Sequence, residues 1–151
     1  MGYILDLRKH VGSRPLIMAG ACVLVFDADR RLLLQKRSDS YDWGTIGGAL
    51  ELADSFEEAA HRELMEEAGL TAESLRFVTL LSGKDMYYRY PNGDEVYNAT
   101  AVYEAVNVQG EPRVNDHEGL DVRYFSLDEP IAGLNPFSEM ILRRAGYIQK
   151  W

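Results

Sequence analysis

Residues 47–70 read GGALELADSFEEAAHRELMEEAGL, and this stretch decides most of the fold and chemistry open to the 151-residue chain. Asp54 or Ser55 can cap a helix by accepting backbone N–H groups, and a helical pattern continues from there to about Ala68. Gly69 then supplies the residue type at which helices commonly end. We therefore expect one helix that follows a double glycine and a short loop.

Three carboxylates share one face of this predicted helix near its carboxyl end: Glu63, Glu66 and Glu67. They oppose the negative end of the helix dipole and repel one another, which costs stability unless a cation lies among them. The simpler alternative is a solvated acidic helix, but such a helix would carry basic partners one turn away. Clustered oxygen ligands suit Mg²⁺ or Mn²⁺. The pattern therefore predicts a divalent metal site.

The negative charge of the chain is concentrated in this same region. The chain has 24 acidic and 16 basic side chains, a net charge of -8, and a pI near 4.9. Residues 51–67 hold seven of the acids and a single Arg, so they carry most of the excess. An acidic surface argues against a groove that binds nucleic acid through its phosphates, because that mode needs clustered Lys and Arg. Bound cations would still allow a phosphate substrate.

Composition and length indicate an ordinary globular protein. The chain is 46% hydrophobic and 26% charged, and 151 residues suit a single domain, which we take to span residues 1–151. No apolar stretch is long enough for a membrane span, and charged residues interrupt the first 18 residues, unlike in a signal peptide. The single cysteine, Cys22, cannot form an internal disulfide. We expect a cytoplasmic protein without a membrane partner.

Strand patterns surround the acidic helix. Residues 16–26 are almost continuously apolar, residues 32–34 follow a turn, and we expect these two segments to pair as central strands. Asn92-Gly93 indicates a hairpin between residues 86–90 and 96–106. Further strands are predicted over residues 75–81 and 122–127, and a last helix from Asn135-Pro136 to about Gly146. This order predicts an α/β sandwich around a mixed sheet.

The segment that starts at Gly48 resembles the signature of the Nudix hydrolases, G-x5-E-x7-R-E-U-x-E-E-x-G-U, in which U is aliphatic. Eight of its nine specified positions match in register. Asp54 replaces the first Glu, Ala53 replaces the Gly usual before it, and Ile46 stands where Pro often precedes the double glycine. The resemblance implies the family's α/β/α sandwich around a mixed β-sheet.

The resemblance also implies roles for individual residues of the signature. Glu66 and Glu67 correspond to metal ligands, and Glu63 to a further ligand or to the group that activates water. The carbonyl of Gly47 is an additional candidate ligand. Arg62 corresponds to the residue that holds the acids in place by ion pairing, the alternative being an ordinary exposed ion pair. The implied cofactor is Mg²⁺, with Mn²⁺ as a substitute.

Four residues outside the signature are candidates for the same site. Glu118 lies where many members of the family supply one more carboxylate, as a ligand or general base, although it could be an ordinary loop acid. Arg37 lies where MutT-type members place a phosphate-binding Arg, or is a basic residue at a strand end. Trp43 is either a pocket wall or a core anchor. Asn135 either reads a base or simply caps the last helix.

The implied reaction is attack of water at phosphorus in a diphosphate linkage, because the sequence lacks the motifs of a covalent nucleophile or a phosphate-binding Walker loop. A nucleoside triphosphate is the preferred small-molecule substrate. The alternatives are ADP-ribose or a nucleotide sugar, the 5′ end of an RNA, and a weakly active binding domain, the last motivated by Asp54 and Ala53. Tyrosines on the predicted hairpin suit base stacking, core packing or a homodimer interface.

Overall fold

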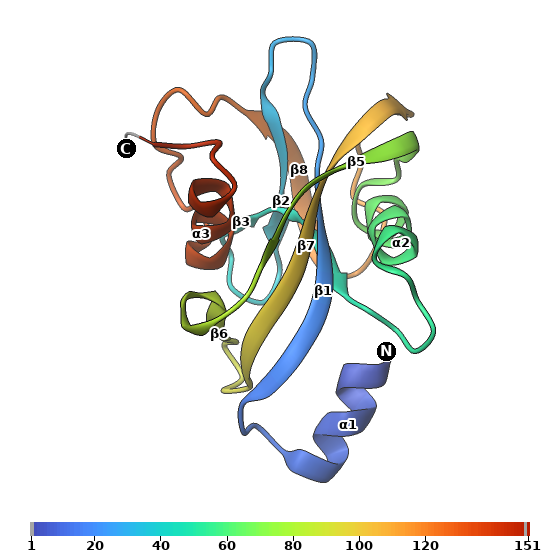
Figure 1. The fold of residues 1–151 in the computed structure, drawn as a ribbon. Helices are drawn as coiled ribbons and strands as arrows, with labels where there is room; N and C mark the ends of the chain where they lie inside the picture. The colour runs from blue at the N-terminus through green and yellow to red at the C-terminus, as the bar shows by residue number, and fades with distance from the viewer. Residues whose placement is uncertain (1, 150) are drawn as a thin grey trace.

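The computed structural model describes residues 2–149 and 151, which form three α-helices, one short 3₁₀ helix and two sheets (Figure 1). The helices are α1 (Tyr3–Val11), α2 (Phe56–Ala68) and α3 (Pro136–Arg144), with the 3₁₀ helix η1 at Lys84–Met86. The strands are β1 (Leu16–Leu24), β2 (Leu32–Arg37), β3 (Trp43–Gly44), β4 (Ile46–Ala49), β5 (Thr71–Leu81), β6 (Tyr87–Arg89), β7 (Glu95–Gln109) and β8 (Gly119–Phe125).

The larger sheet has the strand order β4-β1-β7-β5, with β6 paired to β7, and the smaller has the order β3-β2-β8. Strands β1 and β7 run parallel while the other pairs are antiparallel, which confirms a mixed sheet. The predicted pairing of residues 16–26 with 32–34 was wrong in its extent. Because β4 and β7 occupy both edges of β1, residues 16–26 pair with β2 only at their end, through an isolated antiparallel bridge between Phe26 and Leu32 in which the neighbouring Leu33 N–H donates to the Val25 carbonyl at 2.9 Å.

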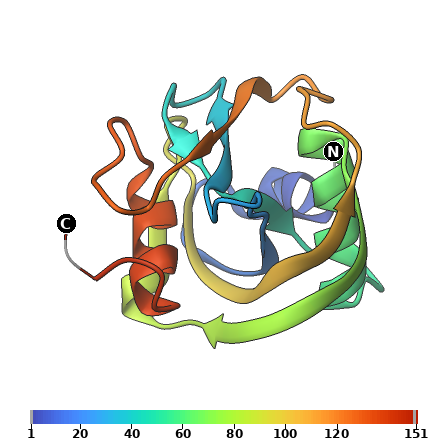
Figure 2. The same ribbon diagram turned by 90° about the horizontal axis from the view of Figure 1, so that it is seen from above.

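Helices α2 and α3 lie on opposite sides of the sheets, as the view from above shows (Figure 2). Ala60 and Leu64 of α2 are fully buried in one apolar core, and Ile141 and Leu142 of α3 in a second. Strand β1 alternates between the two, since Val23 packs toward α2 and its neighbours pack toward α3. This confirms the α/β/α sandwich.

Helix α2 begins and ends close to the predicted positions. Ser55, rather than Asp54, is the cap: its hydroxyl accepts the Glu58 N–H at 3.0 Å, and the Glu58 carboxylate accepts the Ser55 N–H at 2.8 Å. At the other end Gly69 adopts the left-handed conformation, with φ 67° and ψ 27°. These local bonds fix the two ends of the helix that carries the acidic residues.

The predicted hairpin is confirmed as β6 and β7. Tyr87 and Tyr97 face each other across it, with ring centroids 5.4 Å apart and side chains about 40% exposed. Ile17, opposite Tyr97 on β1, is 83% exposed. A homodimer formed through this apolar surface stays a prediction. None of the helices within the described residues has the length and apolarity needed to cross a bilayer.

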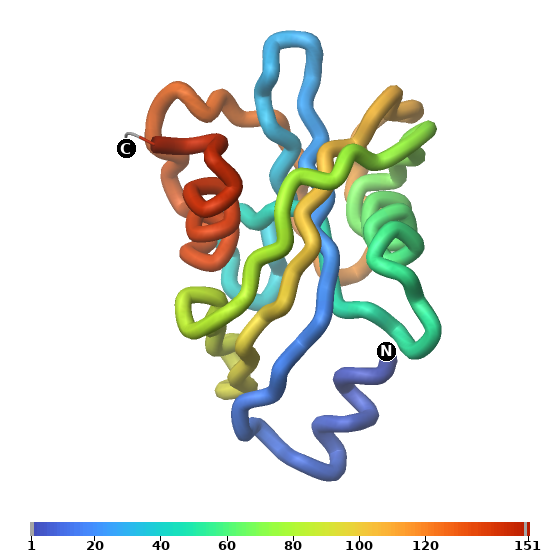
Figure 3. The backbone as a smooth tube through the Cα atoms, in the orientation of Figure 1, coloured from blue at the N-terminus to red at the C-terminus, as the bar shows by residue number. Residues whose placement is uncertain are grey.

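Helix α1 was not predicted, because the charged residues between its apolar ones were interpreted only as evidence against a signal peptide, although they leave an amphipathic helical pattern. It precedes β1 and stands apart from the two layers of helices, and the amino end of the chain lies beside the loop that leads into α2 (Figure 3). The Tyr3 N–H donates to the Glu51 carboxylate of that loop at 2.8 Å. The chain start is thereby tied to the segment between β4 and α2.

That loop contains a strained residue. Ala53 has φ 70° in the turn closed by the Asp54 N–H and the Glu51 carbonyl, a conformation that favours glycine. We expect Ala53→Gly to raise the free energy of unfolding by about 1 kcal/mol, because it removes the steric cost of the left-handed conformation. Urea denaturation measures this.

The matched control is Ala72→Gly in β5, where the backbone has no positive φ and the same change should cost about 0.5–1 kcal/mol. Equal destabilisation by both substitutions would contradict the strain at Ala53.

A cluster around Glu104 joins β7 to the segment after α3. Burial opposes ionisation of this carboxyl, but hydrogen bonds from Tyr147 and Arg30 and the nearby Arg76 hold the pKa of Glu104 below its ordinary value of 4.5. Because folding lowers this pKa, the stabilisation is complete above about pH 4.5 and disappears as the pH falls further. Glu104→Gln should therefore flatten the loss of stability with acid, whereas the exposed control Glu129→Gln should parallel the wild type in pH-dependent urea unfolding.

Candidate active site

The site begins with two glycines that allow β4 to approach its neighbours closely. A Cβ atom on Gly47 would lie 2.3 Å from the Ala21 carbonyl oxygen of β1, and one on Gly48 would lie 2.5 Å from Glu63 Oε1. Any larger residue would push α2 or β1 away. The missing side chains therefore let the acidic end of α2 pack directly on the backbone of β4.

Glu67 is the most deeply placed carboxylate of this region. It is 6% exposed, and its Oε1 accepts the Gly47 N–H at 2.8 Å. Burial, followed by the nearby charge of Glu63, raises the pKa of Glu67 well above its ordinary value, even though hydrogen bonds from Gln35 and Gly47 favour the charged form. A buried, hydrogen-bonded carboxylate with a raised pKa is a group that a cation would stabilise.

Glu63 lies one turn earlier on α2, against Gly48. Burial raises the pKa of Glu63 to about 7, and the charges of Glu66, Glu118 and Asp116 act in the same direction, opposed by Arg62. The surroundings of Glu63 are thus dominated by negative charge. Glu63 can hold or release a proton near neutral pH, which suits a general base.

A further carboxylate, Asp116, was missed by the sequence analysis. One oxygen each from Glu67, Asp116 and Glu118 lies within 4.8 Å of the others. The Asp116 Oδ1 also accepts the N–H groups of Glu118 and Gly119, both at 3.1 Å, so it shapes the loop that presents Glu118. In the sequence, the available sign of this role was that Asp116 and Glu118 flank His117. Only the fold brings the loop that carries them close to α2.

Glu66 lies at the exposed margin of the cluster. Its side chain is 52% exposed and its Oε1 is 3.8 Å from the Arg62 Nε. It falls outside the group of three oxygens formed by Glu67, Asp116 and Glu118. The structure therefore brings Glu63, Glu67 and Glu118 together and leaves Glu66 beside them.

Arg62 ties the helix to the loop before it. Its guanidinium pairs with Asp54, donates to the Ala49 carbonyl at 3.1 Å and lies 3.7 Å from Glu63. Asp54 also accepts the Glu51 N–H at 2.8 Å, so the shorter side chain still joins the loop to the helix. The Asp in place of Glu thus leaves this connection intact.

A hard divalent cation fits this set of donors. The three clustered groups are all carboxylates, and one of them is nearly fully buried without a positively charged partner at hydrogen-bond distance among the described residues. Mg²⁺ and Mn²⁺ prefer such oxygen ligands. The Gly47 carbonyl, which is the candidate backbone ligand, lies in β4, and the N–H of the same residue donates to Glu67.

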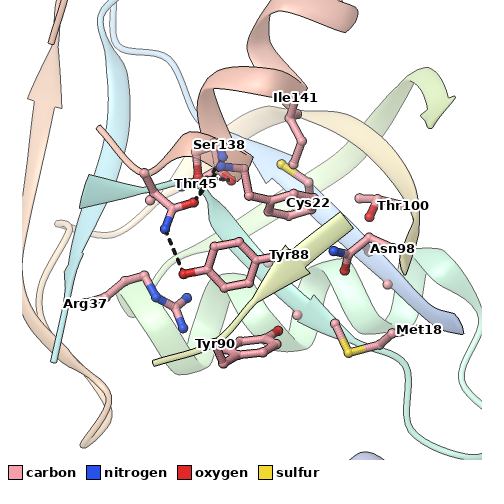
Figure 4. A pocket seen from close by; sticks show the side chains of 17 residues that line it. Met18, Cys22, Arg37, Thr45, Tyr88, Tyr90, Asn98, Thr100, Ser138 and Ile141 are labelled. Atoms are coloured by element: carbon pink, nitrogen blue, oxygen red, sulfur yellow. Dashed lines mark hydrogen bonds between the residues drawn. The ribbon is translucent and has the colours of Figure 1, made fainter. Parts of the chain in front are cut away.

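Two cavities meet at the site. The smaller, of about 90 Å³, lies between β1, β7 and the start of α3, and Figure 4 shows Tyr88, Asn98 and Thr100 around it. The larger, of about 460 Å³, is lined by Glu63, Glu67 and Glu118 among others. The residues common to both linings mark where the cavities join: Met18, Arg37, Gly47, Gly48 and Tyr90.

Arg37 lies at the end of β2, where the two cavities join, which is a suitable position for binding phosphate. Its guanidinium donates to both carboxylate oxygens of Asp39, at 3.0 and 2.9 Å, which fixes its orientation. Trp43 is different, because it lines neither cavity. It is 9% exposed and packs against Phe125 with ring centroids 4.8 Å apart, so its surroundings are those of a core anchor rather than a pocket wall.

Asn135 lines the smaller cavity, but its amide is already engaged. Its Oδ1 accepts the N–H groups of Phe137 and Ser138 as the cap of α3, and its Nδ2 donates to Asp42 and to the Tyr88 hydroxyl. The oxygen of the Asn135 amide thus caps α3, and its nitrogen is engaged by Asp42 and Tyr88. Asn98 and Thr100, which are 5% and 4% exposed, were not singled out from the sequence.

The chain was compared with proteins of known family. A family model described as "NUDIX domain" matches residues 16–145. A Burkholderia pseudomallei protein described as a MutT NUDIX hydrolase has a structure similar to this one, with a TM-score of 0.69 and 26% identity, covering 85% of this chain and 97% of that one. The NUDIX domain of Shewanella oneidensis NrtR, solved with ADP ribose, gives a TM-score of 0.59 at 19% identity, covering 95% and 99%.

Curated relatives carry several activity names. An "oxidized purine nucleoside triphosphate hydrolase" of Danio rerio is 29% identical over 78% of this chain and 69% of its own length. A "NAD-capped RNA hydrolase NudC" of Actinobacillus succinogenes is 29% identical over 73% of this chain. The match spans only 38% of that NudC protein. The family model covers most of the chain and agrees with the fold and the double-glycine strand, so the chain belongs to the NUDIX domain family of hydrolases.

Proposed function

We propose that this chain is a Mg²⁺-dependent pyrophosphohydrolase that cleaves a diphosphate linkage in a nucleoside diphosphate-linked substrate. The observation that carries the proposal is that Glu63, Glu67 and Glu118 line one cavity that joins a smaller one with aromatic walls, and that Asp116 lies close to Glu67 and Glu118. Carboxylates that could hold a hard cation beside a cavity with aromatic and polar walls suit this chemistry.

The residues divide into three roles. Glu67, Asp116 and Glu118 would hold the cation, with Glu66 and the Gly47 carbonyl as outer candidates, and the cation neutralises phosphate charge and acidifies a water. Glu63 is the candidate base, because it lines the same cavity as Glu67 and Glu118 and its carboxylate lies against Gly48, 3.7 Å from the Arg62 guanidinium. Arg62 is a positioning residue that holds α2 against the loop.

The substrate would occupy both cavities. The base would point into the smaller cavity, where Tyr88, Tyr90 and Phe137 provide aromatic surfaces and Asn98 and Thr100 offer polar groups, and the sugar and phosphates would extend into the larger one. Base reading falls to Thr100 and to the Asn98 Oδ1, since the Asn98 Nδ2 donates to the Met86 carbonyl, rather than to Asn135, whose oxygen and nitrogen are both engaged. The phosphates would lie at the junction beside Arg37, which is oriented by Asp39.

Names of the relatives support three substrate types. The Danio rerio protein acts, by its name, on oxidised purine nucleoside triphosphates, and the Shewanella domain was solved with ADP ribose. The NudC relatives make a capped RNA end a further candidate, although the acidic balance of this chain disfavours extended contacts with RNA.

A panel of substrates tests the proposal. Phosphate and nucleoside monophosphate release is measured with Mg²⁺ and with EDTA for nucleoside triphosphates, ADP-ribose, nucleotide sugars, and triphosphorylated and NAD-capped RNA. We expect turnover of at least one free nucleotide, abolished by EDTA. The absence of turnover across the panel would overturn the proposed activity.

Glu67→Gln tests the metal site. We expect a loss of kcat of about 100-fold or more and a much smaller rise in melting temperature on adding Mg²⁺ or Mn²⁺. The metal-free melting temperature should not fall, because the amide can still accept the Gly47 N–H and carries no buried charge. Thermal unfolding with and without metal measures both effects.

Glu129→Gln, on an exposed loop, is the control for loss of one negative charge. An unchanged metal-induced shift in Glu67→Gln would count against Glu67 as a ligand. Measurable wild-type turnover that Glu67→Gln abolishes would reject the alternative of a weakly active binding domain.

A further inference from the structure

Helix α1 forms a wall of the larger cavity, although it lies outside residues 16–145 that match the family model. Ile4, Leu5 and Arg8 of this helix line the same cavity as Glu63 and Glu67. Leu5 is 51% exposed, so its side chain is available to a ligand. The lining of the cavity that holds the carboxylates is thus made partly by a segment that the family match does not include.

Arg8 fixes α1 in this position. Its side chain is 8% exposed, and its guanidinium donates to the Gly12 and Arg14 carbonyls and, at 2.6 Å, to the Glu95 carbonyl of β7. The guanidinium is also 3.7 Å from the Asp94 carboxylate. Together with the bond from the Tyr3 N–H to Glu51, these contacts hold both ends of α1 against the domain.

The charges around the larger cavity do not favour a terminal phosphate near α1. Five acidic residues line this cavity, against two arginines. Arg37 is paired with Asp39, and Arg8 with backbone carbonyls and Asp94. A divalent cation at Glu67, Asp116 and Glu118 would offset the charge there, but the α1 side offers the apolar side chains of Ile4 and Leu5 and no unpaired arginine among the residues described as lining it.

We propose that α1 is a specificity element: Ile4 and Leu5 contact an uncharged organic group on the far side of the diphosphate, so that the enzyme prefers nucleoside diphosphates bearing such a group to nucleoside triphosphates. This inference rests on the proposed hydrolase function. An organic group buries its carbon skeleton against Ile4 and Leu5, whereas a terminal phosphate loses hydration there without gaining a cation. The inference reverses the preference for triphosphates drawn from the sequence.

The test compares kcat/KM within pairs that share a base: ADP-ribose with ATP, GDP-mannose with GTP, and UDP-glucose with UTP. In the pair that is cleaved fastest, the member with the sugar should be preferred about tenfold or more. Leu5→Lys supplies a cation beside a terminal phosphate and should reduce this preference about fivefold or more. Ile4→Ala should raise KM for the sugar compound and leave kcat within about twofold.

His10→Lys is the matched control, because it adds a positive charge to the same helix at a residue that does not line the larger cavity. It should leave the preference within about twofold of the wild type, and the Mg²⁺-induced rise in melting temperature should persist in all three variants, which shows that they fold with the metal site intact.

A wild-type preference for the triphosphate, or equal effects of Leu5→Lys and His10→Lys on the ratio, would overturn the role of α1 while leaving the hydrolase function standing. The absence of hydrolysis in every pair and across the wider panel would overturn the proposed function, and the inference with it.

Discussion

The hydrogen bond from the Gly47 N–H to the Glu67 carboxylate, 2.8 Å long, joins the two elements on which the site depends. It can form only because Gly47 and Gly48 have no side chains: a Cβ at either position would collide with β1 or with Glu63. Strand β4 therefore packs between β1 and the end of α2. The same contact buries the Glu67 carboxylate, and a bound cation would stabilise the charged form of this buried group.

This contact helps to explain the negative net charge of the chain. Seven acids lie between residues 51 and 67, yet of these only Glu63 and Glu67 line the larger cavity, where Glu118 joins them from a distant loop and Asp116 lies close to Glu67 and Glu118. The pKa values of Glu63 and Glu67 are both raised, first by burial and then by their neighbours. Mutual repulsion among these carboxylates lowers the stability of the fold, and a bound metal ion would remove this repulsion. Folding, metal binding and phosphate binding therefore depend on one cluster of carboxylates.

Local patterns predicted the parts of the fold that local bonds determine. The ends of α2 and the β6–β7 hairpin follow from a capping serine, a left-handed glycine and an Asn-Gly turn, and all were found near the expected residues. The parallel contact of β1 with β7, the position of α1 and the approach of Asp116 depend on segments far apart in the chain. A strand's pairing partner, and a loop acid's distance from a helix, are set by the packed sheets, which residue spacing along the chain does not encode.

The central claim is that Glu67 and its acidic neighbours form the metal site of this protein. Anomalous diffraction from crystals grown with Mn²⁺ tests it most directly, because the manganese signal locates the ion independently of any activity. We predict an anomalous peak bound to the Glu67 carboxylate and to at least one of Asp116 and Glu118. A peak located elsewhere, with the Glu67 carboxylate bound only by the Gly47 N–H and Gln35, would contradict the account.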